Sequence, residues 1–278
     1  MTDEPPNPEQ SGRPDFDIDS RVSRPARLYN YLVGGSGHFS VDRKTAEAVA
    51  EGMPGGLDTI RDAVKAVGDF VARVVQYLTA EADARQLLYV GTSVPAEDQI
   101  HLIAHKVAPD ARVVYVGNDP VVMALAHELR QDTDEGTTAY VHGTLRAPEQ
   151  IWEQAAQTLD PRRPVAILIP TTLCLVPDEA QPHAITRYLL DVAPSGSHLM
   201  VAHPIADMPA EGRRTLSERL NEAMSGRYTM RTPDEVARFF DGLDLVDPGL
   251  VPINRWRPAD GTPPGDPYPM LGAVGLKP

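Results

Sequence analysis

Cysteine is almost absent from this sequence, and its scarcity limits the classes of protein to consider. Cys174 is the single cysteine among 278 residues. One cysteine forms no intrachain disulfide and supplies no cysteine-based metal site. Because small secreted domains depend on disulfide frameworks, this composition predicts a cytoplasmic protein.

Long apolar runs are also absent. No stretch reaches about 18 uninterrupted apolar residues, so we expect no membrane span. Residues 1–20 are polar, acidic and proline-containing, without the basic start and apolar core of a secretory signal. We expect this segment to be a disordered leader.

Positive charge is scarce as well. The chain has 26 Lys and Arg residues against 39 Asp and Glu residues, for a formal net charge of −13. Proteins that bind nucleic acid usually need a basic surface to displace counterions. The composition therefore favours a small-molecule substrate or another protein over a nucleic-acid partner, and we predict the small molecule. It leaves the oligomeric state open, a homo-oligomer included.

The sequence is rich in buried-strand patterns that alternate with helical ones. Hydrophobic residues make up 42% of the chain, which is enough for one large α/β core. Residues 86–90 and 112–117 are apolar runs separated by a helix-length segment, 96–107. This order predicts a βαβ unit, and such units bind nucleotide-like ligands at the carboxyl ends of their strands.

The alternation continues to the end of the chain. We expect strands at 138–142, 165–169, 197–202, 243–246 and 268–276, and helices at 120–130, 148–158, 180–192, 211–224 and 233–241. With the first two strands, the sheet would have seven. We assign residues 83–278 to this α/β domain.

Residues 21–82 are predicted to form a helical N-terminal extension. Helices are expected at 24–33, 42–51 and 57–80, and the glycines of residues 34–37 end the first of them. Glycines beside a helix permit hinge motion, so the extension is a candidate lid over the cleft. The alternative is a helix packed on the edge of the sheet through aromatic contacts.

Several stretches together resemble a known family. They are residues 26–35, Val114–Pro120, Tyr140–Arg146, 236–242 and 255–258. The chain is similar to the methyltransferase-like family that depends on S-adenosylmethionine (SAM), is abundant in actinobacteria and was formerly a domain of unknown function. The resemblance implies a Rossmann-like, seven-stranded class I methyltransferase fold with its last strand antiparallel to the rest, and SAM as cofactor.

The chain departs from the cofactor pattern that the resemblance implies. Three acidic residues usually hold SAM in this fold, near its methionine end, its ribose and its adenine. Tyr89, Gly117 and Thr144 stand at those positions, and Ser93 replaces a glycine. Each lost hydrogen bond to a charged group costs about 1.5–3 kcal/mol, so we expect weakened SAM binding and chemistry other than standard methyl transfer. Asp119 is a candidate replacement for the ribose acid.

The candidate cofactor contacts follow from these loops and strand ends. They are Gly34, Gly35, Gly91, Thr92, Ser93, Asn118, Asp119, Thr144 and Leu145.

The candidate catalytic residues are His203, Thr171 and Tyr31. His203 follows the predicted strand 197–202 and is a candidate acid or base near neutral pH, or a histidine bonded to the backbone at a strand end. Thr171 follows the strand before it and either binds substrate or caps a turn. Tyr31 belongs to the candidate lid. Cys174 is interpreted as a buried structural thiol. No histidine pair has metal-binding spacing, so no metal is expected.

Three functions remain open at this stage. The first is a small-molecule tailoring enzyme of secondary metabolism that keeps the fold without standard methyl transfer. The second is a SAM-dependent methyltransferase with an atypical cofactor site. The third is a non-catalytic binding or regulatory subunit, which a cleft filled by Tyr89 would favour.

Overall fold

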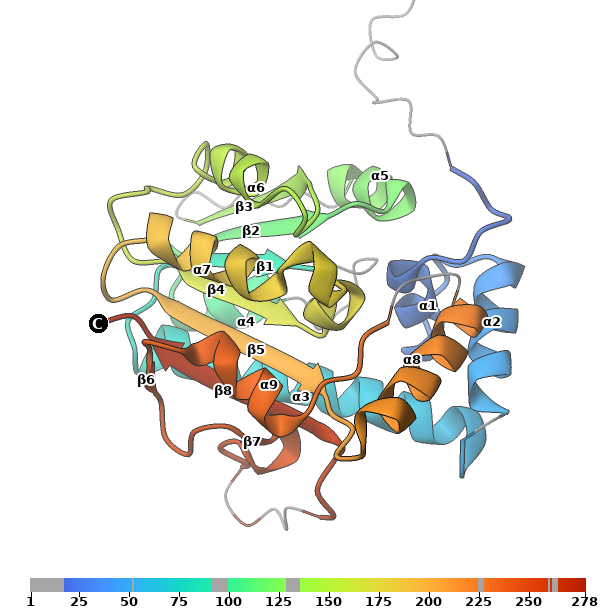
Figure 1. Ribbon diagram of the computed structural model, residues 1–278. Helices are drawn as coiled ribbons and strands as arrows, with labels where there is room; N and C mark the ends of the chain where they lie inside the picture. Colours follow the sequence, from blue (N-terminus) through green and yellow to red (C-terminus); the bar gives the residue numbers. More distant parts are fainter. Residues whose placement is uncertain are drawn as a thin grey trace, which may run out of the picture.

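A twisted, mostly parallel sheet forms the centre of the molecule (Figure 1). The structure, a computed structural model, describes residues 18–51, 53–91, 100–128, 136–224, 228–259, 261 and 265–278. In this part of the chain the sheet has eight strands in the order β3-β2-β1-β4-β5-β8-β6, and β7 also pairs with β8. The strands are β1 (Gln86–Val90), β2 (Arg112–Gly117), β3 (Thr137–His142), β4 (Ala166–Pro170), β5 (His198–Pro204), β6 (Asp244–Leu245), β7 (Val251–Pro252) and β8 (Met270–Leu276).

The last strand runs against its neighbours. β8 pairs antiparallel with β5, from His198 opposite Leu276 to Pro204 opposite Met270, whereas β1 to β5 are mutually parallel. The predicted fold, with an antiparallel last strand, is confirmed. The two-residue strand β7 was not predicted, because a pair of residues carries no readable alternation.

Helices cover both faces of the sheet. The helices are α1 (Pro25–Leu32), α2 (Ser40–Ala50), α3 (Gly56–Ala80), α4 (Ile100–Val107), α5 (Pro120–Glu128), α6 (Pro148–Ala155), α7 (Pro182–Val192), α8 (Ala210–Met224) and α9 (Pro233–Ala237). Short 3-10 turns occupy Thr172–Leu175, Asp178–Ala180, Arg238–Phe240 and Ile253–Arg255. The helix predicted at 233–241 is therefore α9 continued by a 3-10 turn. Residues 96–99 and 129–130 of two predicted helices lie outside the described residues.

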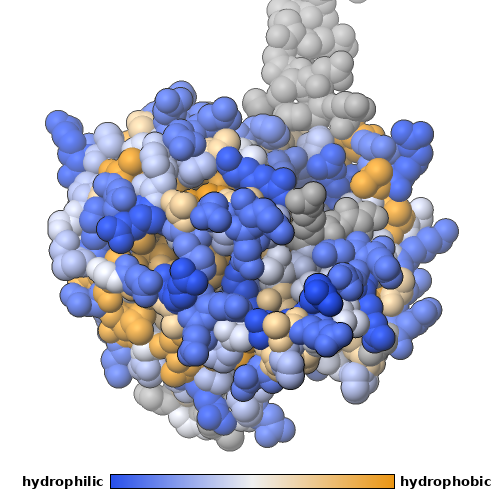
Figure 2. All heavy atoms as spheres, in the orientation of Figure 1, coloured by the Kyte–Doolittle hydropathy of each residue, from blue (hydrophilic) through white to orange (hydrophobic). Residues whose placement is uncertain are grey.

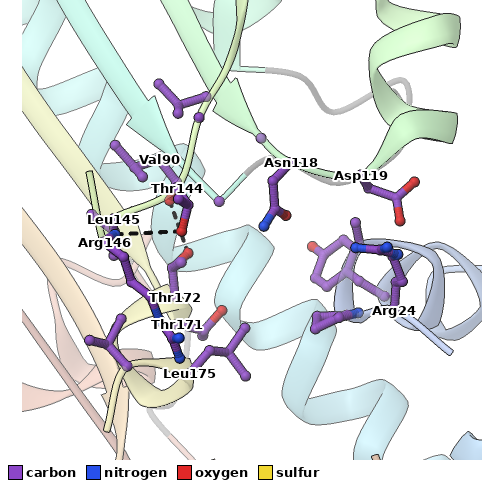
Figure 3. A pocket seen from close by; sticks show the side chains of 18 residues that line it. Arg24, Val90, Asn118, Asp119, Thr144, Leu145, Arg146, Thr171, Thr172 and Leu175 are labelled. Carbon is purple, nitrogen blue, oxygen red and sulfur yellow. Dashed lines mark hydrogen bonds between the residues drawn. The ribbon is translucent and has the colours of Figure 1, made fainter. Parts of the chain in front are cut away.

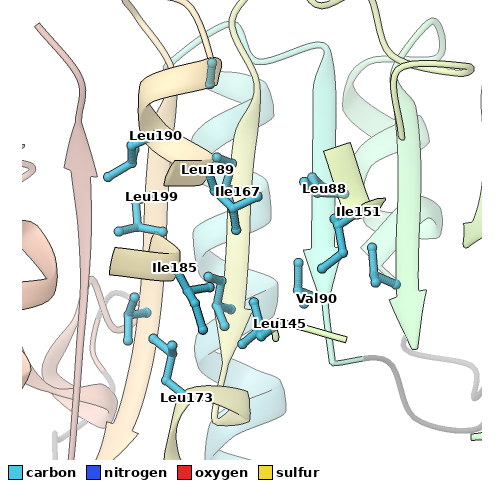
Figure 4. Packing of buried hydrophobic residues seen from close by; sticks show 14 of the residues in the cluster. Leu88, Val90, Leu145, Ile151, Ile167, Leu173, Ile185, Leu189, Leu190 and Leu199 are labelled. Atoms are coloured by element: carbon cyan, nitrogen blue, oxygen red, sulfur yellow. The ribbon is translucent and has the colours of Figure 1, made fainter. Parts of the chain in front are cut away.

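Strand alternation separates the core into two hydrophobic clusters. Leu88, Val90 and Ile167 pack with residues of α6 and α7 on one face (Figure 4). Their sequence neighbours Leu87 and Leu168 pack with α3 and α4 on the other face. Successive side chains of a strand point to opposite faces, so a continuous apolar run serves both layers.

Helix α3 belongs to the sheet domain as much as to the N-terminal segment. Val67, Phe70, Val74 and Leu78 are buried in the same cluster as β1 and β2. The earlier turns of α3 instead pack on the small cluster of Leu28, Leu32 and Ala46 between α1 and α2. The predicted boundary at residue 82 therefore separates elements that share one core.

The N-terminal helices gather at one end of the sheet. α1 contacts α2, α3 and α5, and α2 also contacts α8 (Figure 1). This end is where the parallel strands finish. The face of the molecule in Figure 2 is mainly hydrophilic, with apolar side chains in small groups. Within the described residues, no helix has the length and apolar character needed to cross a membrane.

Candidate functional site

A cavity of about 460 Å³ lies at the carboxyl ends of β1, β2, β3 and β4 (Figure 3). Its volume falls within the range of small-molecule sites, about 300–1,000 Å³. The order β2-β1-β4 places it at the point where the chain reverses its direction of strand addition, which is where open α/β sheets bind ligands. It is lined by Arg24, Pro25, Ala26, Tyr29, Val90, Gly91, Val116, Gly117, Asn118, Asp119, Gly143, Thr144, Leu145, Arg146, Thr171, Thr172, Leu175 and Val176.

Gly91 and Thr172 form the floor where β1 and β4 end. Gly91 has a φ of +106°, and a Cβ there would lie 1.8 Å from Thr172 Oγ1. The Thr172 hydroxyl lies 3.0 Å from the Val90 carbonyl and 3.2 Å from that of Pro170, to which it donates. Both the backbone angle and the space require glycine at position 91.

Of the three positions that usually carry acids in this fold, two line the cavity and one does not. Gly117 and Thr144 line the cavity and leave it without carboxylates at those places. Tyr89 does not line the cavity. Its ring lies 5.6 Å from the Tyr115 ring, within the cluster that α3 and α4 cover, and burial raises its pKa. Tyr89 therefore leaves the cavity unfilled.

Asp119 is the carboxylate in the described cavity lining, and much of its bonding capacity is used elsewhere. Its Oδ1 accepts hydrogen bonds from Val121 N at 2.9 Å and Val122 N at 3.3 Å, which caps α5. Its Oδ2 lies 3.9 Å from Arg27 Nε, is buried, and has no hydrogen-bond partner among the described residues.

Arg27 connects this wall to the N-terminal helices. Arg27 is 1% exposed, and its Nε lies 3.3 Å from Asp42 Oδ2. Asp42 in turn accepts from the backbone N–H groups of Arg24 and Phe39, at 3.1 and 2.8 Å. A buried Asp42–Arg27–Asp119 cluster thus joins α1 and α2 to the loop after β2.

Thr171 lines the cavity in an uncommon backbone conformation. Its φ of +56° is in the left-handed region, where non-glycine residues are rare. The Thr171 N–H donates to the Ala202 carbonyl at 2.9 Å, and the Cys174 thiol donates to the Thr171 carbonyl at 2.7 Å. Burial raises the Cys174 pKa to about 12, which supports the structural interpretation of this thiol.

His203 does not face the cavity, in contrast to the sequence-based expectation. β5 continues to Pro204 because its ladder with β8 extends that far, so His203 lies inside the strand and is 0% exposed. Its Nδ1 is 2.6 Å from the Pro204 carbonyl, and its Nε2 is 2.8 Å from Arg231 Nη1. Burial, together with the Arg231 charge, lowers its pKa to about 3. A neutral imidazole with both nitrogens engaged is unsuited to acid–base catalysis.

Arg231 is buried beneath the turn after β4 and holds that turn through hydrogen bonds. It is 1% exposed and donates to the carbonyls of Leu173 and Val176, each at 2.9 Å, and to Asp178 Oδ1 at 2.7 Å. These carbonyls belong to the turn that follows β4 and lines the cavity. Sequence reasoning missed Arg231, because its partners lie more than 25 residues away along the chain.

Tyr31 also lies outside the cavity lining. Its ring packs 5.1 Å from the His38 ring, and the Arg61 guanidinium lies 5.7 Å from its centroid. Tyr29, on another side of α1, lines the cavity instead. The prediction selected a helix that does line the cavity, but Tyr31 lies on a different face of that helix. The helical period of 3.6 residues per turn shows which residues share a face, but it does not show which face is buried.

Gly34 and Gly35 end α1 and do not line the cavity. Gly35 N donates to Asn30 O at 2.8 Å and Gly34 N to Tyr31 O at 3.1 Å, with a φ of +83° at Gly34. This is the hydrogen-bond pattern of a Schellman cap. Of the other predicted cofactor contacts, Gly91, Asn118, Asp119, Thr144 and Leu145 line the cavity, whereas Thr92 and Ser93 lie outside the described residues.

Sequence reasoning also missed two cavity-lining arginines, Arg24 and Arg146. Both stand in stretches quoted above or next to them, but a lone arginine beside a turn carries no chemical signature. No group of three or more His, Cys, Asp or Glu side chains in the described part of the chain is arranged to hold a metal ion.

The strand order, the antiparallel β8 and a cavity at the strand ends define a protein of the class I methyltransferase fold. The chain belongs to the S-adenosyl methyltransferase family, whose model matches residues 11–278.

Two solved structures are similar over nearly the whole chain. A protein of the DUF574 family from Streptomyces avermitilis is 35% identical, with a TM-score of 0.84, over 94% of this chain and 99% of that one. A putative methyltransferase from Thermobifida fusca is 28% identical, with a TM-score of 0.81, over 92% and 96% of the two chains. No curated protein matches.

Proposed function

We propose that this chain is an enzyme that acts on a small molecule in the cavity at the ends of β1 to β4. The observation that carries the proposal is the cavity itself, of about 460 Å³, whose lining includes several neutral hydrogen-bonding groups. Asn118, Thr144, Thr171 and Thr172 present amide and hydroxyl groups where the fold usually presents carboxylates. A nucleoside-like ligand fits this chemistry, because its ring and ribose edges need both donors and acceptors.

The cavity lies where open α/β sheets bind ligands, but two of its lining residues are neutral where the fold usually presents acids. Gly117 supplies no side chain for a ribose, and Thr144 supplies a neutral hydroxyl. Each missing charge-assisted bond costs about 1.5–3 kcal/mol, or roughly a tenfold to hundredfold loss in affinity. We therefore propose a tailoring reaction that does not rely on tight SAM binding.

A SAM-dependent methyltransferase with an atypical site is the second candidate. Its support is the buried Oδ2 of Asp119, which has no hydrogen-bond partner among the described residues and stands in the cavity wall. A ligand hydroxyl would satisfy that oxygen. A non-catalytic subunit has less support, since Tyr89 packs on Tyr115 and leaves the cavity open.

Calorimetric titration with adenosine and with S-adenosylhomocysteine tests the proposal. We expect measurable, weak binding of both ligands, and at least a tenfold loss in the variant Thr144→Trp, whose indole would fill the cavity. Glu149→Trp is the matched control, because Glu149 is exposed on α6 and does not line the cavity. Equal affinities in the two variants, or no binding by the native chain, would overturn the proposal.

A further inference from the structure

Within the described part of the chain, the charged side chains that line the cavity are two arginines and one aspartate. Arg24 is the residue before α1, and Arg146 belongs to the turn between β3 and α6. Figure 3 shows them on opposite sides of the cavity, with Asn118 and Thr172 between them. Asp119, the third, already caps α5 and faces Arg27.

Neither arginine is neutralised. Among the described residues, no carboxylate lies within ion-pair distance of the Arg24 or Arg146 guanidinium. The pKa of Asp19 is lowered mainly by its hydrogen bond to Arg21, at 3.0 Å, and only slightly by Arg24. With Arg27, Asp42 and Asp119 included, the charges of the described residues named here still sum to +1, in a chain whose net charge is −13.

The start of α1 adds to this positive region. Arg24, Pro25 and Ala26 all line the cavity, and the Arg24 side chain does not cap the helix. Asp42 Oδ1 accepts from Arg24 N at 3.1 Å, and the N–H groups of Arg27 and Leu28 donate to the Arg24 carbonyl. Because proline has no N–H, the Ala26 N–H is the donor left at this helix start, where partial positive charge favours anions. The α5 start, on the same side of the sheet, differs because the Asp119 carboxylate caps it.

The residues at the usual acid positions fit the same pattern. Gly117 and Thr144 are neutral, so two negative charges that would repel an anion are missing from the cavity. At these two positions, no carboxylate opposes the positive charges of Arg24 and Arg146.

We propose that the ligand of this cavity carries a carboxylate or phosphate, bound by Arg24 and the start of α1, with Arg146 contributing a second positive charge. The inference deepens the proposed function and rests on it, because it names the chemical class of the molecule that the cavity takes. Arg24 is half-buried and beside the helix start, whereas Arg146 is exposed, so Arg24 has the larger part.

Three ligands that share one nucleoside isolate the anionic group. They are adenosine, adenosine-5′-carboxylic acid and adenosine 5′-monophosphate, titrated into the full chain at low and high salt. We expect one or both anions to bind at least tenfold more tightly than adenosine, and the difference to shrink in high salt. The tighter of the two anions identifies the group.

Variants assign the effect to the two side chains. Arg24→Gln is expected to weaken binding of the preferred anion about tenfold, and Arg146→Gln about twofold to threefold, with adenosine unaffected. Arg43→Gln is the control, because Arg43 is exposed on α2 and does not line the cavity. Thermal melting confirms that each variant folds.

The failures of the two proposals differ. If adenosine binds as tightly as both anions, or if Arg24→Gln and Arg146→Gln leave the anion affinity unchanged, the anion site is overturned and the proposed function stands. If none of the three ligands binds, the proposed function is overturned together with the inference.

Discussion

At the scale of single residues, His203 is a histidine near a strand end whose contacts give it a structural role. It lies near the carboxyl end of a parallel strand, where ligands commonly bind. It is nevertheless fully buried between the Pro204 carbonyl and the Arg231 guanidinium. Because a neutral imidazole has one donor and one acceptor nitrogen, these contacts assign Nδ1–H as the donor and Nε2 as the acceptor.

This assignment predicts a pH dependence of stability. The His203 pKa is about 3 in the folded chain and near 6.5 when unfolded, so the unfolded chain binds more protons between these values. The contribution is fully present above about pH 6.5 and is lost as pH falls toward 3, by up to about 1.4 kcal/mol per pH unit.

Urea denaturation from pH 7 to 4 measures this effect. Buried His101 and His198 have pKa values lowered in the same direction, so the test compares slopes. In His203→Gln, the free energy of unfolding is expected to fall less steeply as the pH decreases, by about the slope that one bound proton contributes. His142→Gln, at an exposed histidine, is the control. An unchanged slope in His203→Gln would show that His203 is not held neutral by the fold.

At the scale of elements, the buried ionic cluster fixes α1 against the sheet. Arg27 is 1% exposed, Asp42 0% and Asp119 2%, and they belong to α1, α2 and the loop that leads into α5. Removing one partner of a buried pair leaves an unpaired charge and costs about 3–5 kcal/mol. Since α1 supplies Arg24 and Tyr29 to the cavity, the cluster also holds one cavity wall.

Arg27→Met is therefore expected to free α1 more than the rest of the molecule. Hydrogen–deuterium exchange of residues 25–32 should rise at least tenfold, while that of α7, on the opposite face, stays unchanged. Arg43→Met on the exposed side of α2 provides the control. Equal exchange of α1 in Arg27→Met and the native chain would mean that this cluster does not hold the helix.

The helices and strands differ in how well the sequence predicts their position and orientation. The apolar runs 86–90 and 112–117 have few alternatives to buried strands, so they and the fold were predicted. Three of the residues predicted at the strand ends, Gly91, Asn118 and Thr144, line the cavity. The face of α1 that is buried depends on packing against α3, and the length of β5 depends on its pairing with β8. For these reasons Tyr31 and His203, which were predicted at the site, lie outside the cavity lining.

At the scale of the whole molecule, we propose that the methyltransferase fold surrounds an altered cofactor site. The chain belongs to the S-adenosyl methyltransferase family and keeps the sheet order and the cavity of its fold. Two of its usual acid positions, Gly117 and Thr144, line that cavity without charge. Tyr89, at the third, packs among aromatic rings, so an acid there would be buried in an apolar cluster.

The central claim, that the cavity of this methyltransferase fold lacks acids at Gly117 and Thr144, is tested most directly by placing acids at both positions. Gly117 has no positive φ that would demand glycine, so Gly117→Asp combined with Thr144→Asp is compatible with the backbone. Titration with SAM is predicted to show a gain in affinity of about tenfold to a hundredfold over the native chain. Gly117→Asn with Thr144→Asn, which adds similar bulk without charge, should show little gain. Equal SAM affinity for the native chain and the acid-restored variant would contradict the account.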